Sequence, residues 1–154
     1  MDNLAIFGAK YLYLFVILVA LIYFLRQPRN KQKEIFIFTI ISLPVIYLVA
    51  ILIGALYFDP RPFVVGHVAP LIPHAPDNGF PSDHTLISAA FAAVIYPYNK
   101  KISWLLWILT LTVGLSRVYV KVHHPIDVIG SMVIAMVTSY LVYFFISRFN
   151  KQTQ

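Results

Sequence analysis

The sequence has no cysteine and little charge. Without cysteine no disulfide can form, so cysteine usage gives no indication of the compartment. Only 12% of the 154 residues are charged, 60% are hydrophobic, and the mean hydropathy is +0.78, which excludes an ordinary soluble core and indicates an integral membrane protein. Internal repeats and low-complexity tracts are also absent, and no stretch is left for a soluble domain. Residues 1–154 are therefore predicted to form a single membrane domain.

Five apolar runs predict an all-α bundle of about five transmembrane helices. About 20 helical residues cross a hydrocarbon layer of roughly 30 Å. The runs are Leu4–Leu25, Glu34–Phe58, Asp83–Pro97, Ile102–Val118 and Ile126–Ile146. The third and fourth runs are short, at about 22 and 25 Å for a rise of about 1.5 Å per residue. We expect their outer ends to lie below the membrane surface.

Basic residues are concentrated in three segments outside these runs. They are Arg26, Arg29, Lys31, Lys33, Lys100, Lys101, Arg148 and Lys151. Because cytoplasmic loops are enriched in lysine and arginine, these segments are predicted to be cytoplasmic, together with the carboxyl terminus. The amino terminus, the loop 59–82 and the segment 119–125 then lie outside. This topology accounts for the net charge of +6, so nucleic-acid binding is not indicated.

Most of the other ionisable residues fall on the predicted outer side. The set consists of His67, His74, His84, His123, His124, Asp59, Asp77, Asp83, Asp127, Arg61, Arg117 and Lys121. Ionisable groups at a membrane face are costly, so a group of them indicates a functional site. The loop 59–82 also contains six prolines and two glycines, which favours a turn-rich loop over a helix.

The segment "PSDH" at 81–84 has the features of an anion site at the start of a helix. Ser82 or Asp83 can cap the helix, so that free backbone N–H groups and the positive end of the helix dipole face outward. In this first turn His84 could give a proton to a departing oxygen. A single histidine at a helix start is more often structural, but two arginines on the same side favour the catalytic interpretation.

The segment "SRVYVKVHHPID" at 116–127 places a carboxylate within reach of an imidazole. Asp127 follows His123 by four positions and His124 by three, so it can pair with either. Such a pair fixes the tautomer of a histidine that acts as nucleophile or base. Arg117 in this segment and Arg61 in "DPRP" at 59–62 carry planar guanidinium groups that suit phosphate oxygens.

These three segments resemble the motifs of the type 2 phosphatidic acid phosphatase family. The third motif is matched in full, the second but for one position, and the first in part. The matching residues are Arg61, Pro62, Pro81, Ser82, His84, Ser116, Arg117, His123 and Asp127. Asp83 replaces a glycine of the second motif, and Gly54 stands where the first has lysine.

The resemblance implies a phosphatase without metal or cofactor. It implies that His123 attacks phosphorus to form a phosphohistidine, that Asp127 orients His123, and that His84 protonates the leaving group and later activates water. It also implies a set of groups that hold the phosphate oxygens, namely Arg61, Arg117, Ser82 and the backbone amide of Asp83. Lys121 or His67 is a candidate to replace the missing lysine. Otherwise His67 and His74 are expected to structure the loop, with recognition of the substrate headgroup as the alternative.

The stretch "RPFVVGHVAPLIPHAPDNGFPSDH" is most similar to the bacterial undecaprenyl-diphosphatases of this family, which recycle a cell-wall lipid carrier. We therefore expect hydrolysis of a prenyl diphosphate to the monophosphate at the outer face of the cell membrane. Within the same class, a phosphatidylglycerophosphate, phosphatidate or lipid A phosphatase is the alternative. Of other classes, a metal or proton-coupled transporter and a non-catalytic protein that binds lipid phosphate remain alternatives.

Overall fold

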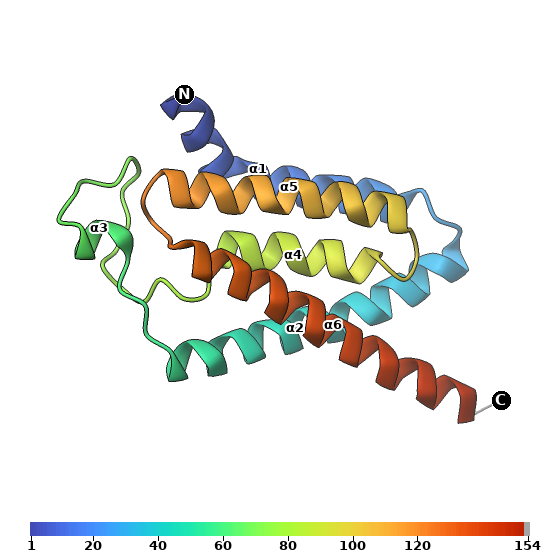
Figure 1. Ribbon diagram of the computed structural model, residues 1–154. Helices are drawn as coiled ribbons and strands as arrows, with labels where there is room; N and C mark the ends of the chain where they lie inside the picture. Colours follow the sequence, from blue (N-terminus) through green and yellow to red (C-terminus); the bar gives the residue numbers. More distant parts are fainter. Residues whose placement is uncertain (153–154) are drawn as a thin grey trace.

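Helices form the whole framework in the computed structural model, which describes residues 1–152 and, for 149–152, the backbone only (Figure 1). They are α1 (Asp2–Leu25), α2 (Arg29–Leu56), α3 (Pro62–Val65), α4 (Asp83–Ile95), α5 (Lys100–Tyr119) and α6 (Pro125–Gln152). The predicted all-α class is confirmed. The side chain of Lys151, one of the basic residues used to predict the topology, lies outside the described residues.

Four of the described helices, α1, α2, α5 and α6, are long and apolar enough to cross a membrane, as expected for an integral membrane protein. The third predicted span is wrong in its length, because α4 has 13 residues and ends at Ile95 instead of Pro97. At about 1.5 Å per residue it measures only about 20 Å. The bundle therefore has four long helices around a short fifth one.

The fourth predicted span is also corrected, in the opposite direction. Helix α5 has 20 residues, which is about 30 Å at 1.5 Å per residue, so it is not short. It begins at Lys100 because the Asn99 side chain accepts the backbone N–H of Ile102 at 3.0 Å and caps the helix before the apolar run starts. A hydropathy pattern does not register this cap.

Helix α4 lies at the centre of the bundle and contacts α1, α2, α5 and α6 (Figure 1). Nine of its 13 residues are buried, and most of the nine are alanine, serine or threonine. Such small side chains let neighbouring helices approach closely, as is usual in membrane bundles. By contrast α1 and α2 hardly meet, which leaves a gap between them over α4.

The outer surface of the long helices is apolar. Large exposed side chains include Leu14, Phe15, Leu48, Ile108 and Met136. In the interior, serine and threonine are fully buried at several positions, namely Ser42, Ser88, Ser103, Thr110 and Ser131. A surface more apolar than parts of the core is typical of helices that face lipid.

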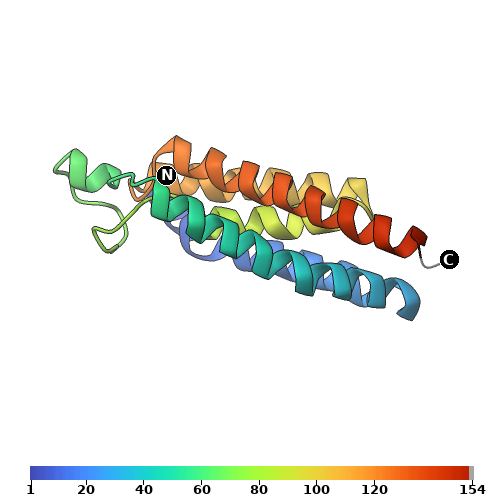
Figure 2. The same cartoon turned by 90° about the horizontal axis from the view of Figure 1, so that it is seen from below.

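The amino terminus, the loop 59–82 and the segment 120–124 gather at one end of the bundle, and the short connections α1–α2 and α4–α5 lie at the other (Figures 1 and 2). This agrees with the predicted grouping of segments by side. The loop 59–82 is turn-rich as expected, except for α3, where Pro62 occupies the first helical position. Proline fits there because that residue's N–H has no partner in a helix.

Candidate active site

Four ionisable side chains from separate parts of the chain are buried together at the loop end of the bundle. Arg61 precedes α3, Arg117 lies in the last turn of α5, His123 joins α5 to α6, and Asp127 lies in the first turn of α6. Their exposed fractions are 5%, 3%, 2% and 0% in that order. Buried charges are costly unless they are paired or hydrogen-bonded. The four side chains therefore form an organised, buried site and not part of a polar surface.

One ring nitrogen of His123 faces hydrogen-bond acceptors, and the other faces hydrogen-bond donors. Nδ1 lies 2.9 Å from the carbonyl oxygen of Gly79 and 3.2 Å from Oδ2 of Asp127, and both of these are acceptors. Nε2 lies 3.2 Å from Nη2 of Arg117 and 3.4 Å from Nη1 of Arg61, which can only donate. The proton therefore sits on Nδ1, and the lone pair of Nε2 points toward the two guanidinium groups.

Burial keeps the imidazole of His123 uncharged. Together with the charges of Arg117 and Arg61, it lowers the pKa of His123 from the usual 6.5 to about 2. A neutral imidazole is the form that can attack phosphorus, so His123 has the protonation state of a nucleophile. The ring of His124 lies elsewhere, with its Nδ1 2.9 Å from Oδ2 of Asp59. The spacing had left both histidines open as partners of Asp127, and the structure pairs its carboxylate with the ring of His123.

Arg61 is held in place by the loop around it. Its Nε donates to Oδ1 of Asp77 at 2.7 Å, its Nη1 to the carbonyl of Val122 at 2.8 Å, and its Nη2 to the carbonyl of Asn78 at 3.1 Å. Partial burial opposes ionisation of Asp77, but the hydrogen bond and charge of Arg61 lower the pKa of this carboxyl. The fixed guanidinium is a preorganised donor for phosphate oxygens.

Arg117 retains an unused donor. Its Nη1 donates to the carbonyl of Ala9 at 3.4 Å and its Nη2 to Nε2 of His74 at 3.0 Å, whereas its buried Nε has no partner among the described residues. A buried N–H without an acceptor costs free energy, so an anion that supplies one would be bound there. Burial and the charge of Arg61 lower the pKa of His74, which keeps it neutral beside these cations.

His74 belongs to the outer group of ionisable residues but was expected only to structure the loop, whereas the structure brings it into the site. Its ring packs edge-on to that of His123 with 6.1 Å between centroids. The sequence held no signal for this contact, because His74 lies in a proline-rich loop whose path no periodic pattern describes. Asp77 and Asn78 were missed as partners of Arg61 for the same reason.

Helix α4 begins at Asp83 as predicted, but Ser82 does not cap it with its side chain. The Ser82 hydroxyl instead accepts from Thr85 Oγ1 at 3.1 Å, and its carbonyl accepts from Ser131 Oγ at 3.0 Å. The first backbone N–H groups of α4 are therefore left without this cap. Ser82 is fully buried beside the first turn of α6, and Asp83 is exposed.

His84 lies at the edge of the site. Its ring packs edge-on against Tyr13 of α1 with 4.6 Å between centroids, and within residues 1–148 it makes no hydrogen bond to His123. It lines an apolar cavity of about 540 Å³ between α1, α2 and α4. The structure thus places His84 where the cationic site meets this cavity.

Lys121 and His67 are not brought into the site. Both are exposed, and the part of the chain with described side chains gives neither side chain a hydrogen bond or ion pair. Gly54 is packed against the loop instead: a Cβ there would lie 3.1 Å from the carbonyl oxygen of Phe80, and the Gly54 carbonyl accepts from Asn78 Nδ2 at 2.9 Å. A lysine at this position would require the loop to shift, which explains the glycine physically.

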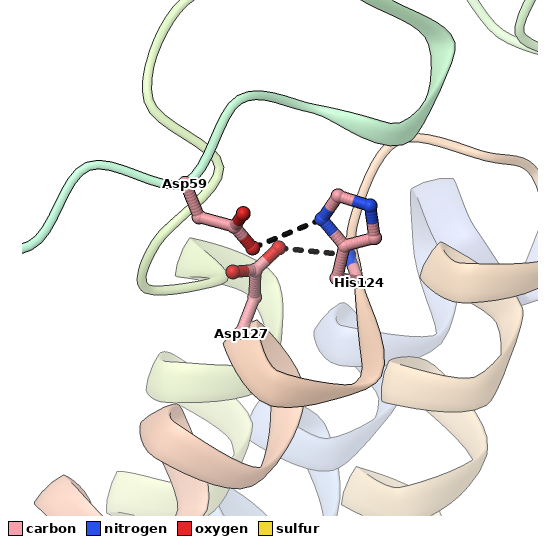
Figure 3. A group of neighbouring side chains, drawn as sticks. All are labelled: Asp59, His124 and Asp127. Atoms are coloured by element: carbon pink, nitrogen blue, oxygen red, sulfur yellow. Dashed lines mark hydrogen bonds and ion pairs between the residues drawn. The ribbon is translucent and has the colours of Figure 1, made fainter. Parts of the chain in front are cut away.

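One group of side chains beside the site has the chemistry of metal ligands. Asp59, His124 and Asp127 each offer a ligand atom, and these atoms lie within 4.8 Å of one another (Figure 3). The same atoms are already hydrogen-bonded, since His124 Nδ1 lies 2.9 Å from Asp59 Oδ2 and the His124 backbone N–H donates to Asp127 Oδ2 at 2.8 Å.

Comparison with known proteins identifies the family of the chain. Residues 35–151 match the PAP2 superfamily. Undecaprenyl-diphosphatase BcrC of Bacillus subtilis is 36% identical over 148 residues, which cover 94% of this chain and 75% of that protein. The bacitracin transport permease protein BcrC of Bacillus licheniformis is 31% identical over 138 residues, 89% of this chain and 68% of that protein. The solved structure of Aquifex aeolicus LpxE has the same fold, with a TM-score of 0.69 at 24% identity over 92% of this chain and 81% of that one. This chain therefore belongs to the PAP2 superfamily, whose motifs its sequence resembles.

Proposed function

We propose that this protein is a membrane lipid phosphatase that hydrolyses undecaprenyl diphosphate to the monophosphate at the outer face of the membrane. The observation that carries the proposal is the buried, neutral imidazole of His123, whose free Nε2 faces the guanidinium groups of Arg61 and Arg117. The similarity to undecaprenyl-diphosphatase BcrC of Bacillus subtilis supports the choice of substrate.

The chemistry follows from the orientation of His123. Nε2 attacks the terminal phosphorus, a P–N bond forms, the bridging P–O bond breaks, and the prenyl monophosphate leaves. The ring then carries a positive charge, which Asp127 stabilises through Nδ1–H. Arg61 and Arg117 hold the phosphate oxygens as charge develops on them. His84 protonates the leaving oxygen and then takes a proton from the water that releases inorganic phosphate from His123.

The cavity beside His84 supports an amphiphilic substrate. Its walls are mostly apolar and include Leu43, Ile46, Leu86 and Ile87. It lies where α1 and α2 hardly meet, and it reaches the first turn of α4. An isoprenoid tail in this cavity would bring a diphosphate to the cationic site.

The outer face is proposed from the distribution of charge. The connections α1–α2 and α4–α5 lie at the end of the bundle opposite to the site (Figure 2). Basic residues gather at this end, namely Arg26 in the first connection, Arg29, Lys31 and Lys33 at the start of α2, and Lys100 and Lys101 at the start of α5. The positive-inside tendency assigns that end to the cytoplasm. The site, the loop 59–82 and the amino terminus then face outward.

Turnover by purified protein in detergent tests the function. Phosphate release is measured with undecaprenyl diphosphate and with phosphatidate at equal concentrations. We expect faster turnover of the diphosphate and no measurable turnover by His123→Ala, which should still bind the lipid. Faster turnover of phosphatidate would refute the substrate, and full turnover by His123→Ala would refute the nucleophile.

Transport is a second candidate, because the Bacillus licheniformis relative is named a transport permease protein. The charges of Arg61 and Arg117 beside the histidines disfavour passage of a cation. Uptake and efflux by proteoliposomes that hold wild-type protein or His123→Ala separate the two functions. If the protein is a hydrolase, the wild type releases phosphate without transporting the substrate. His123→Ala then shows neither phosphate release nor transport.

A further inference from the structure

A second pair of imidazole and carboxylate lies directly behind the pair of His123 and Asp127. His124 Nδ1 is 2.9 Å from Oδ2 of Asp59, with exposed side-chain fractions of 33% and 14%. Figure 3 shows the Asp59 carboxylate and the His124 ring turned toward each other, with the Asp127 carboxylate beside them and linked to the His124 backbone nitrogen. Neither Asp59 nor His124 has a part in the chemistry described above.

This second pair is connected to both acceptors that hold Nδ1 of His123. One acceptor is Asp127 Oδ2, which also accepts the His124 backbone N–H at 2.8 Å. The other acceptor is the Gly79 carbonyl, and the Gly79 N–H donates to the Asp59 carbonyl at 2.8 Å. The Asp59 N–H in turn donates to Asn78 Oδ1 at 2.9 Å. The side chain, the backbone N–H and the backbone carbonyl of Asp59 thus each have a hydrogen-bond partner.

We propose that Asp59 and His124 are positioning residues that hold Asp127, and through it the ring of His123, in the geometry for in-line attack. The proposal rests on the proposed function, because it concerns the same nucleophile. The His124 backbone N–H holds the Asp127 carboxylate, and the Asp59 carboxylate holds the His124 ring. Groups that orient a metal-ligating histidine contribute about 10- to 100-fold to activity, and we expect a similar contribution for this reacting histidine.

The matched variants are Asp59→Asn, which keeps shape and removes charge, and Asp59→Glu, which keeps charge. We expect Asp59→Asn to lower kcat about 10- to 100-fold while KM for undecaprenyl diphosphate stays within about twofold. Asp59→Glu should restore part of kcat. His67→Gln, which changes an exposed histidine of the same loop, is the control with wild-type kinetics.

A double-mutant cycle tests whether the two residues act together. The double variant Asp59→Asn, His124→Phe should be no slower than the worse single variant, because both changes break the same pair. Additive losses would overturn the proposal, as would wild-type kcat in Asp59→Asn. Loss of wild-type activity in chelator with recovery on added Zn²⁺ would also overturn it, because the three residues would then be ligands. If His123→Ala were fully active, the proposed function itself would fail, whatever the Asp59 variants show.

Discussion

Asp127 is the residue on which the orientation of His123 depends most directly. It is fully buried, and one oxygen accepts both Nδ1–H of His123 and the His124 backbone N–H. We predict that Asp127→Asn lowers kcat by roughly 10²- to 10⁴-fold with little change in KM, because the amide offers no negative charge to the imidazolium that forms. Initial rates over a range of lipid concentrations measure both parameters. Asp2→Asn, at the same end of the bundle, is the control, and equal losses in the two variants would contradict this role.

The neutral state of His123 also has a consequence for stability. The folded protein holds the pKa of His123 near 2, whereas an exposed histidine titrates near 6.5. Below about pH 6.5 the unfolded chain therefore binds a proton that the folded protein does not, so the free energy of unfolding falls by about 1.4 kcal/mol per pH unit from this group. Melting temperatures at pH 7 and pH 5 should differ more in the wild type than in His123→Gln. The same difference in both would disprove the prediction.

At the scale of helices, glycine permits a close contact between α6 and the loop before α4. A Cβ on Gly130 would overlap the ring of Phe80, which precedes Pro81 and Ser82 of the site. We predict that Gly130→Ala costs about 1–3 kcal/mol of stability, because the overlap must move a packed aromatic ring. Thermal unfolding in detergent measures this loss. Gly8→Ala is the control with a smaller loss. The Ser116 hydroxyl that the added methyl would overlap can rotate away, and the Ser116 Cβ, 3.0 Å from the methyl, needs to shift only slightly.

The cavity between α1, α2 and α4 provides a test of the tail-binding proposal. Ile87 of α4 lines it, so Ile87→Trp should raise KM for undecaprenyl diphosphate severalfold by filling the space. A short, water-soluble prenyl diphosphate should be hydrolysed as before. The control is Ile129→Trp on the exposed face of α6, away from the cavity. An unchanged KM for the long lipid in Ile87→Trp would rule out this location for the tail.

At the scale of the whole molecule, the orientation in the membrane can be tested with unusual ease. The native sequence has no cysteine, so single cysteines introduced by mutation are the only thiols. We predict that a membrane-impermeant maleimide labels His67→Cys on intact cells, and that it labels Lys31→Cys only after the membrane is opened. The reverse pattern would place the site in the cytoplasm and refute the outer-face proposal.

Some of the architecture was predictable because it depends on composition and local pattern. Long apolar runs have few alternatives to membrane helices, so the bundle and its two sides were found from the sequence. Errors arose where local capping or tertiary contact sets the end of a helix, as at Asn99 and Ile95. Lys121 was proposed for phosphate contact, but the structure leaves it exposed and without a contact to the site.

The sequence by itself determined the class of protein, the helices and most residues of the site, because hydropathy and motif spacing are local properties of the chain. Spacing left both histidines open as partners of Asp127, and the tertiary structure pairs it with His123, as the motif resemblance implies. Only the tertiary structure showed that His74 meets Arg117 and that Asp59 and His124 form a second pair. These contacts join residues up to 65 positions apart through a proline-rich loop without periodicity. The physical reason is that hydrogen bonds and packing against α4 fix the course of this loop, and such long-range interactions leave no pattern in the sequence.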